Sequence, residues 1–402
     1  MDAEHQSTNF RCATCGEEGN FGSSYPTTSC SRIGRRDSAC PSCVKIQAVD
    51  RQIAETRAFL AHLKAHRATL LRNINKDHDP FLDIIPTELA SRIFTFCMED
   101  TVPTAVNNHV PLTLAAVSRR WRAIAQSTAA LWTQIRLELN HLHHLPECED
   151  LLRQWLERSA QLPLSIFLHA WFSSCLDDDR WGIVYSVVKI LNEHSSRWCH
   201  LTLHVPCFIV GQFKSGPEGA HNLRVLSIKP SFLYTTHSDT LKKGFDVGTP
   251  LPSPETVTLV GFHLADIKIR WENVTNVSLS TLSIRECFRL FEMAPRLLEC
   301  TLHYINPNST LTPNPISPIF LYQLSRLDID ARFTAEDLFD HMVLPSLNSL
   351  VYRGCEQPLH PLISCIRRSA CPITTLTFNQ HYIEDIGTDI YKLLWAVPVS
   401  KN

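Results

Sequence analysis

The sequence predicts an α/β protein in three parts: a long N-terminal helix, a small all-α module, and an irregular array of strand–helix repeats that forms a curved parallel sheet. Three observations support this prediction. Apolar residues follow a heptad pattern over residues 44–76, short helical patterns with tryptophans fill residues 81–135, and one apolar strand pattern recurs through residues 136–395. Because apolar periodicity is the main sequence signal of secondary structure, each part is expected to contain a different kind of element.

The composition is that of a folded protein without a strong charge. Of 402 residues, 44% are hydrophobic and 19% are charged, and the formal net charge is −2. No basic field would attract nucleic acid or an anionic membrane, so we expect neither as a partner. No apolar run reaches the length of about 18 residues that a membrane helix needs, and residues 1–20 contain no apolar signal core. We therefore expect an intracellular protein, cytoplasmic or nuclear.

Residues 1–43 contain none of the 49 leucines, and we expect them to form a flexible leader. Two CxxC pairs, Cys12 with Cys15 and Cys40 with Cys43, could bind zinc tetrahedrally through four thiolates. Against zinc, the intervening loop is long, holds no histidine and carries an extra Cys30. The total of 15 cysteines is odd, which favours free thiols in a reducing compartment, and we predict no metal or cofactor.

The heptad pattern over residues 44–76 predicts one continuous helix, since this stretch contains neither proline nor glycine. The seam positions are Ile46, Val49, Ile53, Thr56, Leu60, Leu63, Arg67, Leu70 and Ile74. Two interpretations stay open: a coiled coil that makes the protein a homodimer, or an amphipathic helix that folds back on its own domain. Thr56 and Arg67 are the polar exceptions in the seam.

Residues 81–135 predict a compact helical module. Pro86 stands at a helix start, and Glu88 follows in the first turn, where a carboxylate meets the positive end of the helix dipole. After an interruption over residues 101–111, we expect a second helix that carries Leu114, Val117, Trp121, Ile124 and Ala125. Leu131 and Trp132 close the module.

The repeats of residues 136–395 are built on the strand pattern apolar-x-x-apolar-x-apolar. From Trp198 onward its first positions fall at residues 198, 223, 254, 274, 297, 324, 347 and 373. With one outlier, these spacings lie within the period of about 20–29 residues that leucine-rich repeats have. Amphipathic helices are expected between strands, near residues 151–158, 181–191, 286–293, 335–342 and 359–369. The alternative is an α/β domain that is not a solenoid.

Several segments resemble the F-box family. Residues 85–89, Ile-Pro-Thr-Glu-Leu, with Ile93 and Phe94, resemble the opening of an F-box, and residues 114–125, Leu-Ala-Ala-Val-Ser-Arg-Arg-Trp-Arg-Ala-Ile-Ala, resemble its second half. Leu131-Trp132 matches the tryptophan that commonly follows. The heptad helix and the motifs at residues 155–159 and 366–373 are similar to fungal F-box proteins with a leucine-rich-repeat-like C-terminal domain. The resemblance covers about residues 44–380.

This resemblance implies a three-helix module that docks on the Skp-type adaptor of a cullin–RING (SCF-type) ubiquitin ligase, with the repeat domain binding a target protein. The residues expected to contact the adaptor are Ile85, Pro86, Leu89, Ile93, Phe94, Val117, Arg119, Trp121, Arg122 and Leu131. Two departures from the family pattern are the long interruption at residues 101–111 and Thr87, where an acidic residue is common.

The sequence contains no motif of a catalytic site, and we do not expect an enzyme. One alternative function is an interaction scaffold that dimerises through residues 44–76 without a ligase. A second is a nucleic-acid binder that depends on zinc at the N-terminal cysteines. The sequence does not identify the target protein.

Overall fold

The computed structural model describes residues 9–11, 18–20, 41–77, 79–99, 109–139, 145–170, 178–230, 244–305, 318–331, 336–354 and 359–379. Cys12, Cys15 and Cys40 lie outside these ranges, and of Cys43 only the backbone is described, so the zinc hypothesis stays a prediction. Most of the 101–111 interruption and residues 380–395 also lie outside them. The chain divides into two compact units, residues 1–79 and residues 80–402.

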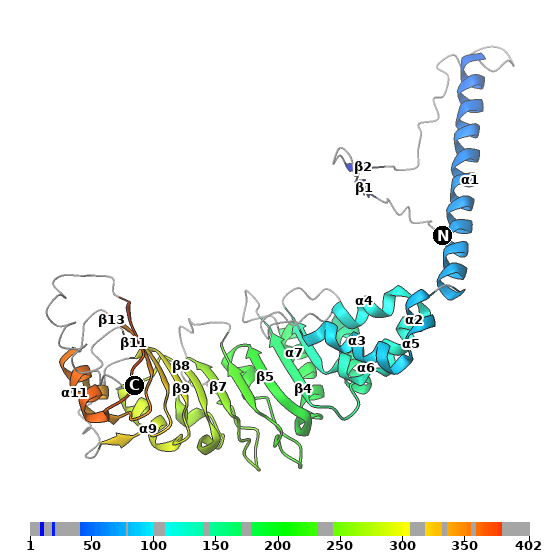
Figure 1. Ribbon diagram of the computed structural model, residues 1–402. Coiled ribbons are helices and arrows are strands. Elements are labelled where there is room, and N and C mark those ends of the chain that lie inside the picture. The colour runs from blue at the N-terminus through cyan, green and yellow to red at the C-terminus, as the bar shows by residue number, and fades with distance from the viewer. Residues whose placement is uncertain are drawn as a thin grey trace. The chain divides into compact units, whose positions relative to one another are not determined.

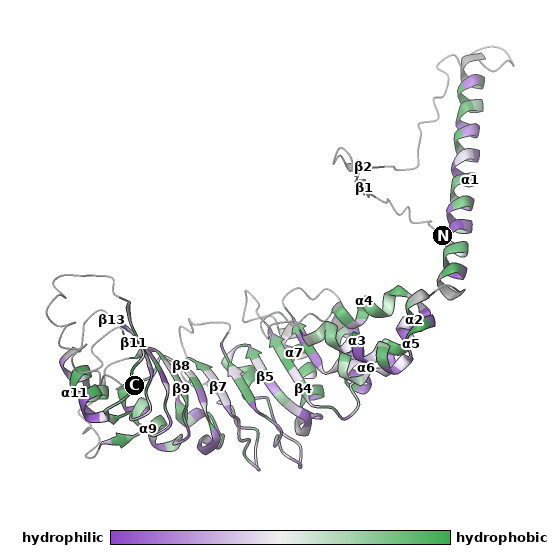
Figure 2. Cartoon of the chain, in the orientation of Figure 1, coloured by the Kyte–Doolittle hydropathy of each residue, from purple (hydrophilic) through white to green (hydrophobic). Residues whose placement is uncertain are grey.

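In the described residues of the first unit there are one long helix and a small strand pair. Strands β1 (Asn9–Arg11) and β2 (Glu18–Asn20) pair antiparallel, and helix α1 covers Pro41–Asp77. The helix predicted over residues 44–76 is therefore present, with a length of about 55 Å. Every side chain from Val44 to Ile74 is exposed, and hydrophobic and hydrophilic residues alternate along the helix (Figure 2).

The second unit begins with short helices. They are α2 (Pro80–Ile84), α3 (Thr87–Glu99), α4 (His109–Val117), α5 (Arg119–Ser127) and the 3-10 turn η1 (Ala129–Trp132). The prediction of one helix through Leu114 and Trp121 is wrong, because Ser118 is extended at φ −149° and ψ 172°. Its hydroxyl accepts a hydrogen bond from the N–H of Trp121 at 3.1 Å and so caps a new helix.

Ten strands then form one parallel sheet in which each strand lies beside its neighbour in the chain order (Figure 1). The strands are β3 (Gln134–Glu138), β4 (Leu164–His169), β5 (Trp198–His204), β6 (Val225–Ile228), β7 (Thr256–Val260), β8 (Asn276–Ser280), β9 (Glu299–Ile305), β11 (Arg326–Ala331), β13 (Ser349–Gly354) and β14 (Thr375–Asn379). Two short strands, β10 (Ile319–Phe320) and β12 (Met342–Val343), pair separately. The expectation of a large parallel sheet is thus confirmed.

The strand register aligns the predicted apolar pattern across the whole sheet. The middle apolar positions are direct partners in one row: Ile135, Ile166, Leu201, Leu226, Val257, Val277, Cys300, Leu327, Leu350 and Leu376. From Ile135 to Leu350 each member of this row is at most 4% exposed. Because side chains along a strand alternate between faces, the residues between these positions lie on the other face of the sheet.

Helices connect several of the strands and cover the buried rows. They are α6 (Leu145–Arg158), α7 (Asp178–Asn192), α8 (Cys207–Val210), α9 (Ile284–Met293), α10 (Glu336–His341) and α11 (Leu359–Ser369). Three further connections are the 3-10 turns η2 (Ser195–Arg197), η4 (Leu264–Asp266) and η5 (Trp271–Asn273). Four thiols, those of Cys287, Cys300, Cys365 and Cys371, are buried, and burial raises the pKa of Cys365 to about 11.

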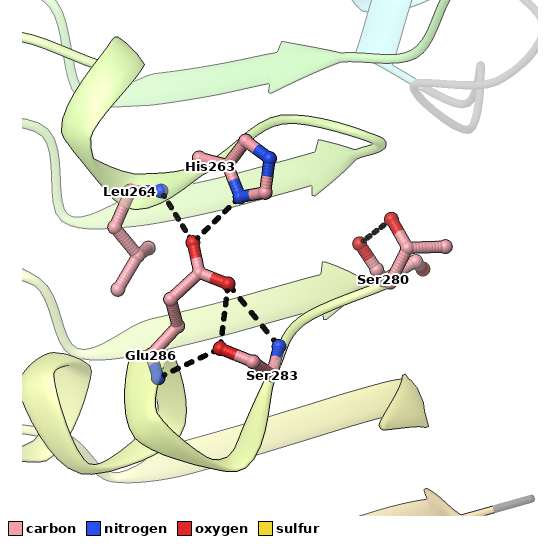
Figure 3. Close-up of polar contacts among 6 residues, drawn as sticks. His263, Leu264, Ser280, Ser283 and Glu286 are labelled. Carbon is pink, nitrogen blue, oxygen red and sulfur yellow. Dashed lines mark hydrogen bonds and ion pairs between the residues drawn. The ribbon is translucent and has the colours of Figure 1, made fainter. Parts of the chain in front are cut away.

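The carboxylate of Glu286 connects helix α9 to the start of the 3-10 turn η4 (Figure 3). One oxygen of Glu286 lies 3.0 Å from Nδ1 of His263 and 3.4 Å from the N–H of Leu264. The other oxygen accepts hydrogen bonds from the backbone N–H and the hydroxyl of Ser283 at 3.1 and 3.0 Å. Burial raises the pKa of Glu286, but the hydrogen bonds from Ser283 and His263 outweigh it and leave the pKa below its usual value.

We expect Glu286→Gln to lower the free energy of unfolding by about 1–2 kcal/mol near neutral pH. Because the folded-state pKa of Glu286 is depressed, its stabilising effect is present above the ordinary value of 4.5 and is lost as pH falls through the folded value. The difference between wild type and variant in the free energy of unfolding, measured by urea denaturation, should therefore shrink as the pH drops below 4.5. Glu292→Gln, an exposed change on the same helix, is the control, and an identical pH dependence of both variants would contradict the assignment.

Candidate functional site

Helix α3 carries two apolar stripes that face in different directions. The first consists of Ala90, Phe94 and Met98, which are 0%, 1% and 5% exposed. The second consists of Leu89, Ile93 and Phe96, which are 52%, 40% and 51% exposed and follow one another at helical steps of four and three. One helix therefore builds a core with one side and leaves a second hydrophobic side on the surface.

The inward stripe packs in a small aromatic core. The ring of Trp121 lies 4.7 Å from that of Phe94 and 5.2 Å from that of Phe81, measured between centroids. Leu131 is fully buried beside them, and Nε1 of Trp132 donates to the carbonyl of Ala125 at 2.8 Å. This core is complete without the outward stripe of α3.

Two arginines of α5, Arg120 and Arg122, connect this helix to its neighbours. Arg120 forms an ion pair with Asp83 and also donates to the carbonyl of Leu82 at 3.0 Å. Nε of Arg122 donates to the carbonyl of Ala115 at 2.8 Å, which ties α5 to α4. These arginines thus hold the module's geometry as well as contributing positive charge to its surface.

The ten residues predicted to contact an adaptor divide into three groups. Six are exposed: Pro86, Leu89, Ile93, Val117, Arg119 and Arg122. Ile85 and Trp121 are half-buried and pack against the module's core. Phe94 and Leu131 are 1% and 0% exposed, so as a correction we assign them to packing, since a side chain enclosed in the core cannot touch a partner.

Among the described residues of the module, three exposed apolar residues are absent from the sequence prediction. Ile84, Phe96 and Leu112 are 81%, 51% and 50% exposed. Phe96 could have been found, because it lies three residues after Ile93 and seven after Leu89 on the same helical face. Ile84 and Leu112 carry no such periodic signal.

The module continues directly into the sheet. The rings of Trp132 and Trp155 meet edge to face at 4.6 Å, and the guanidinium of Arg158 lies 4.6 Å from the ring centre of Trp132. Trp155 of α6 contacts both the module's core and the main core. These contacts fix the outward stripe of α3 relative to the first strands of the sheet.

The face of the sheet opposite the buried rows forms a second candidate surface. Its central row runs through Arg136, Phe167, Thr202, Ser227, Thr258, Ser278, Thr301, Asp328, Val351 and Thr377. Five successive strands, β5 to β9, contribute a serine or threonine to this row. The hydroxyl groups offer both donors and acceptors, which suits recognition of polar groups on another molecule.

The two ends of this row differ in character. Near β3, Arg136 lies 4.5 Å from the ring centre of Phe167, which in turn lies 5.1 Å from the ring of His204. Burial lowers the pKa of His204, and nearby cationic side chains, first Lys229, add to the effect. Near β13, Arg353 donates to both carboxylate oxygens of Asp328 at 2.7 and 3.0 Å. The first end is aromatic and cationic, whereas the second is an internally neutralised ion pair.

One serine–histidine pair joins the neighbouring strands β4 and β5. Oγ of Ser165 is 2.8 Å from Nδ1 of His200, whose pKa is lowered by burial and by Arg224. Hydrolytic triads add a carboxylate that orients the histidine. Within the described ranges no carboxylate contacts His200, so we assign the pair to bridging β4 and β5.

Among the described residues, no group of three or more histidine, cysteine or acidic side chains is placed to hold a metal ion. Within the same part of the chain, no helix is both long enough and apolar enough to cross a membrane. Comparison with protein-family models finds no match to this sequence, and comparison with curated proteins finds none either.

Proposed function

We propose that the chain is an F-box protein, in which residues 80–132 dock on a Skp-type adaptor of an SCF-type ubiquitin ligase and the sheet holds a target protein. The observation that carries this proposal is the exposed stripe of Leu89, Ile93 and Phe96 beside a core that is already complete. An exposed apolar cluster on a small folded module is typical of a protein-binding site. This stripe lies within the segment whose sequence resembles an F-box.

The free energy gained by covering the stripe can be estimated from the apolar side chains that would be buried. Fully burying a leucine, isoleucine or phenylalanine side chain contributes about 1.5–3 kcal/mol, and each of these three is about half exposed. Covering the stripe would therefore contribute on the order of 3 kcal/mol before the contacts of neighbouring residues are added. Arg119 and Arg122, both exposed nearby in sequence, would act at the rim, where charge affects specificity more than affinity.

The second part of the proposal is that the sheet is an irregular leucine-rich-repeat solenoid. Its support is the strictly sequential strand order and the in-register apolar rows, since stacked repeats bury one continuous core. The central row of hydroxyl groups would then contact the target. Tethering would raise the effective concentration of the target's lysines near the ubiquitin carrier, and the bond-forming chemistry would belong to other subunits.

The test is to titrate the full-length chain with a purified fungal Skp-type adaptor and to measure binding by isothermal titration calorimetry. Saturable binding with one adaptor per chain supports the proposal. Absence of binding at concentrations well above the micromolar range would contradict the proposed function. A complementary readout is whether a cullin joins the complex only when the adaptor is present.

A second candidate function is an interaction scaffold without a ligase. It is favoured by the exposed heptad seam of α1, which offers an association surface independent of the helical module. This alternative predicts the same target-binding sheet but no adaptor binding, so the titration separates the two.

A further inference from the structure

The seam of α1 is a hydrophobic stripe that is exposed to solvent and interrupted only by Thr56 and Arg67. Its apolar members are between 36% and 53% exposed: Ile46, Val49, Ile53, Leu60, Leu63, Leu70 and Ile74. Packing of an apolar face, more than intrinsic propensity, is what stabilises most protein helices. A seam that repeats every seven residues over about 42 Å matches another helix with the same repeat.

We propose that α1 pairs with the α1 of a second copy of the chain, and that the two helices run antiparallel. The proposal follows from where the two polar seam residues lie. In a parallel pair each seam residue meets its own counterpart, so Arg67 would face Arg67 of the other copy inside the seam. Two guanidinium groups placed opposite each other repel, and because the seam shields them from water, this repulsion would destabilise the parallel dimer.

An antiparallel pair removes this conflict. In the register that sets Arg67 against Thr56 of the other copy, the remaining layers between Val49 and Ile74 are all apolar. Ile46 lies outside this stretch, opposite Asp77. They pair Val49 with Ile74, Ile53 with Leu70, and Leu60 with Leu63. Each pairing occurs twice by symmetry, giving six apolar layers and two in which a guanidinium meets a hydroxyl group. Both polar residues are thereby placed in the same layer, which lies between two apolar layers.

The distribution of charge along α1 favours the same direction. The second half of the helix, residues 57–74, carries no acidic residue and four basic ones: Arg57, Lys64, Arg67 and Arg72. The half before it has two basic and two acidic residues: Lys45, Asp50, Arg51 and Glu55. A parallel pair would set the two basic halves side by side. The antiparallel register instead sets residues 67–74, which carry Arg67 and Arg72, against residues 49–56, which carry Asp50, Arg51 and Glu55. It does bring Arg57 near Lys64 at the rim, where exposed charges interact weakly.

The first test is the mass of the full-length protein in solution, by light scattering over a range of concentrations. We expect twice the chain mass of 45.7 kDa. Leu63→Glu should return the mass to that of one chain, because it places a carboxylate in the central layer. A wild type that stays monomeric at the highest concentration overturns the proposal, as does a Leu63→Glu variant that remains dimeric.

The direction of the helices is tested by Thr56→Glu. In the antiparallel pair each new carboxylate meets Arg67 of the other copy, so the dimer–monomer midpoint should move to lower concentration by on the order of tenfold. In a parallel pair the two new carboxylates would face one another, and association would weaken instead. That second result would overturn the antiparallel arrangement.

Thr69→Glu is the matched control. Thr56 and Thr69 are both exposed threonines of α1 whose hydroxyl groups donate to the carbonyl four residues earlier, at 2.7 and 3.0 Å. Only Thr56 lies in the seam, so Thr69→Glu should leave the midpoint unchanged within about twofold. An equal shift for both variants would mean that net charge, not seam pairing, controls association, and would overturn the proposal. This inference does not depend on adaptor binding, which resides in the other unit.

Discussion

A double change of Leu89→Asp and Phe96→Asp is expected to weaken binding of the Skp-type adaptor by at least about a hundredfold. Both side chains lie on the outward stripe of α3, and a carboxylate buried at an interface without a partner costs several kcal/mol. Because neither side chain contributes to the module's core, the melting temperature should stay within about 3 °C of wild type. Isothermal titration calorimetry and a thermal melt provide the two measurements.

Leu298→Asp is the matched control for this prediction. It makes the same chemical change at a leucine that is 41% exposed, but directly before strand β9 rather than in the helical module. Adaptor affinity should be unaffected by it. If Leu298→Asp and the double variant bind equally well, the outward stripe of α3 is not the docking surface.

Removing the indole of Trp198 is expected to produce the largest loss of stability. Trp198 is fully buried at the start of β5, where its Nε1 donates to the carbonyl of Leu191 at 3.2 Å and its ring lies 5.9 Å from that of Phe213. Trp198→Ala would leave a cavity and remove one of the two hydrogen bonds that the Leu191 carbonyl accepts, the other coming from the N–H of His194 at 3.0 Å. Together these losses should lower the free energy of unfolding by about 3–5 kcal/mol. Urea denaturation followed by far-ultraviolet circular dichroism measures this loss.

Two companion variants divide the effect of Trp198 into its parts. Trp198→Phe retains most of the ring volume, so its smaller cost, about 1–3 kcal/mol, reports the lost hydrogen bond and the small gap. Tyr322→Ala removes an aromatic ring that is 65% exposed and should cost less than about 0.5 kcal/mol. A Trp198→Ala variant no less stable than Tyr322→Ala would show that this first position of the strand pattern does not anchor the core.

The strand array was predictable because its physical basis is local. Each strand needs apolar residues at alternate positions to bury one face, so the pattern repeats wherever a strand joins the sheet. Trp132 and Trp198 illustrate this regularity, since each precedes or begins a strand and donates its Nε1 proton to a carbonyl seven residues earlier. The strand order and register then follow, because successive units stack on the one before.

The helical module was harder to predict in detail. The apolar pattern through Leu114 and Trp121 suggests one helix, yet the hydroxyl of Ser118 competes for the backbone and starts a second one. The residues of α3 posed a different difficulty, because both of its stripes are apolar. Phe94 and Ile93 are adjacent in the sequence and similar in hydrophobicity, yet one is 1% exposed and the other 40%.

By itself, the sequence determined the long helix α1, the alternation of strands and helices, and the apolar positions that align across the sheet. These properties depend on periodicity, which the chain carries within each short segment. Only the tertiary structure decided which stripe of α3 is enclosed by Phe81 and Trp121 and which stays exposed, and how hydroxyl groups from five strands come to share one row. Such choices depend on contacts between residues far apart in the chain, and hydrophobicity alone does not distinguish a side chain that fills a core from one that awaits a partner.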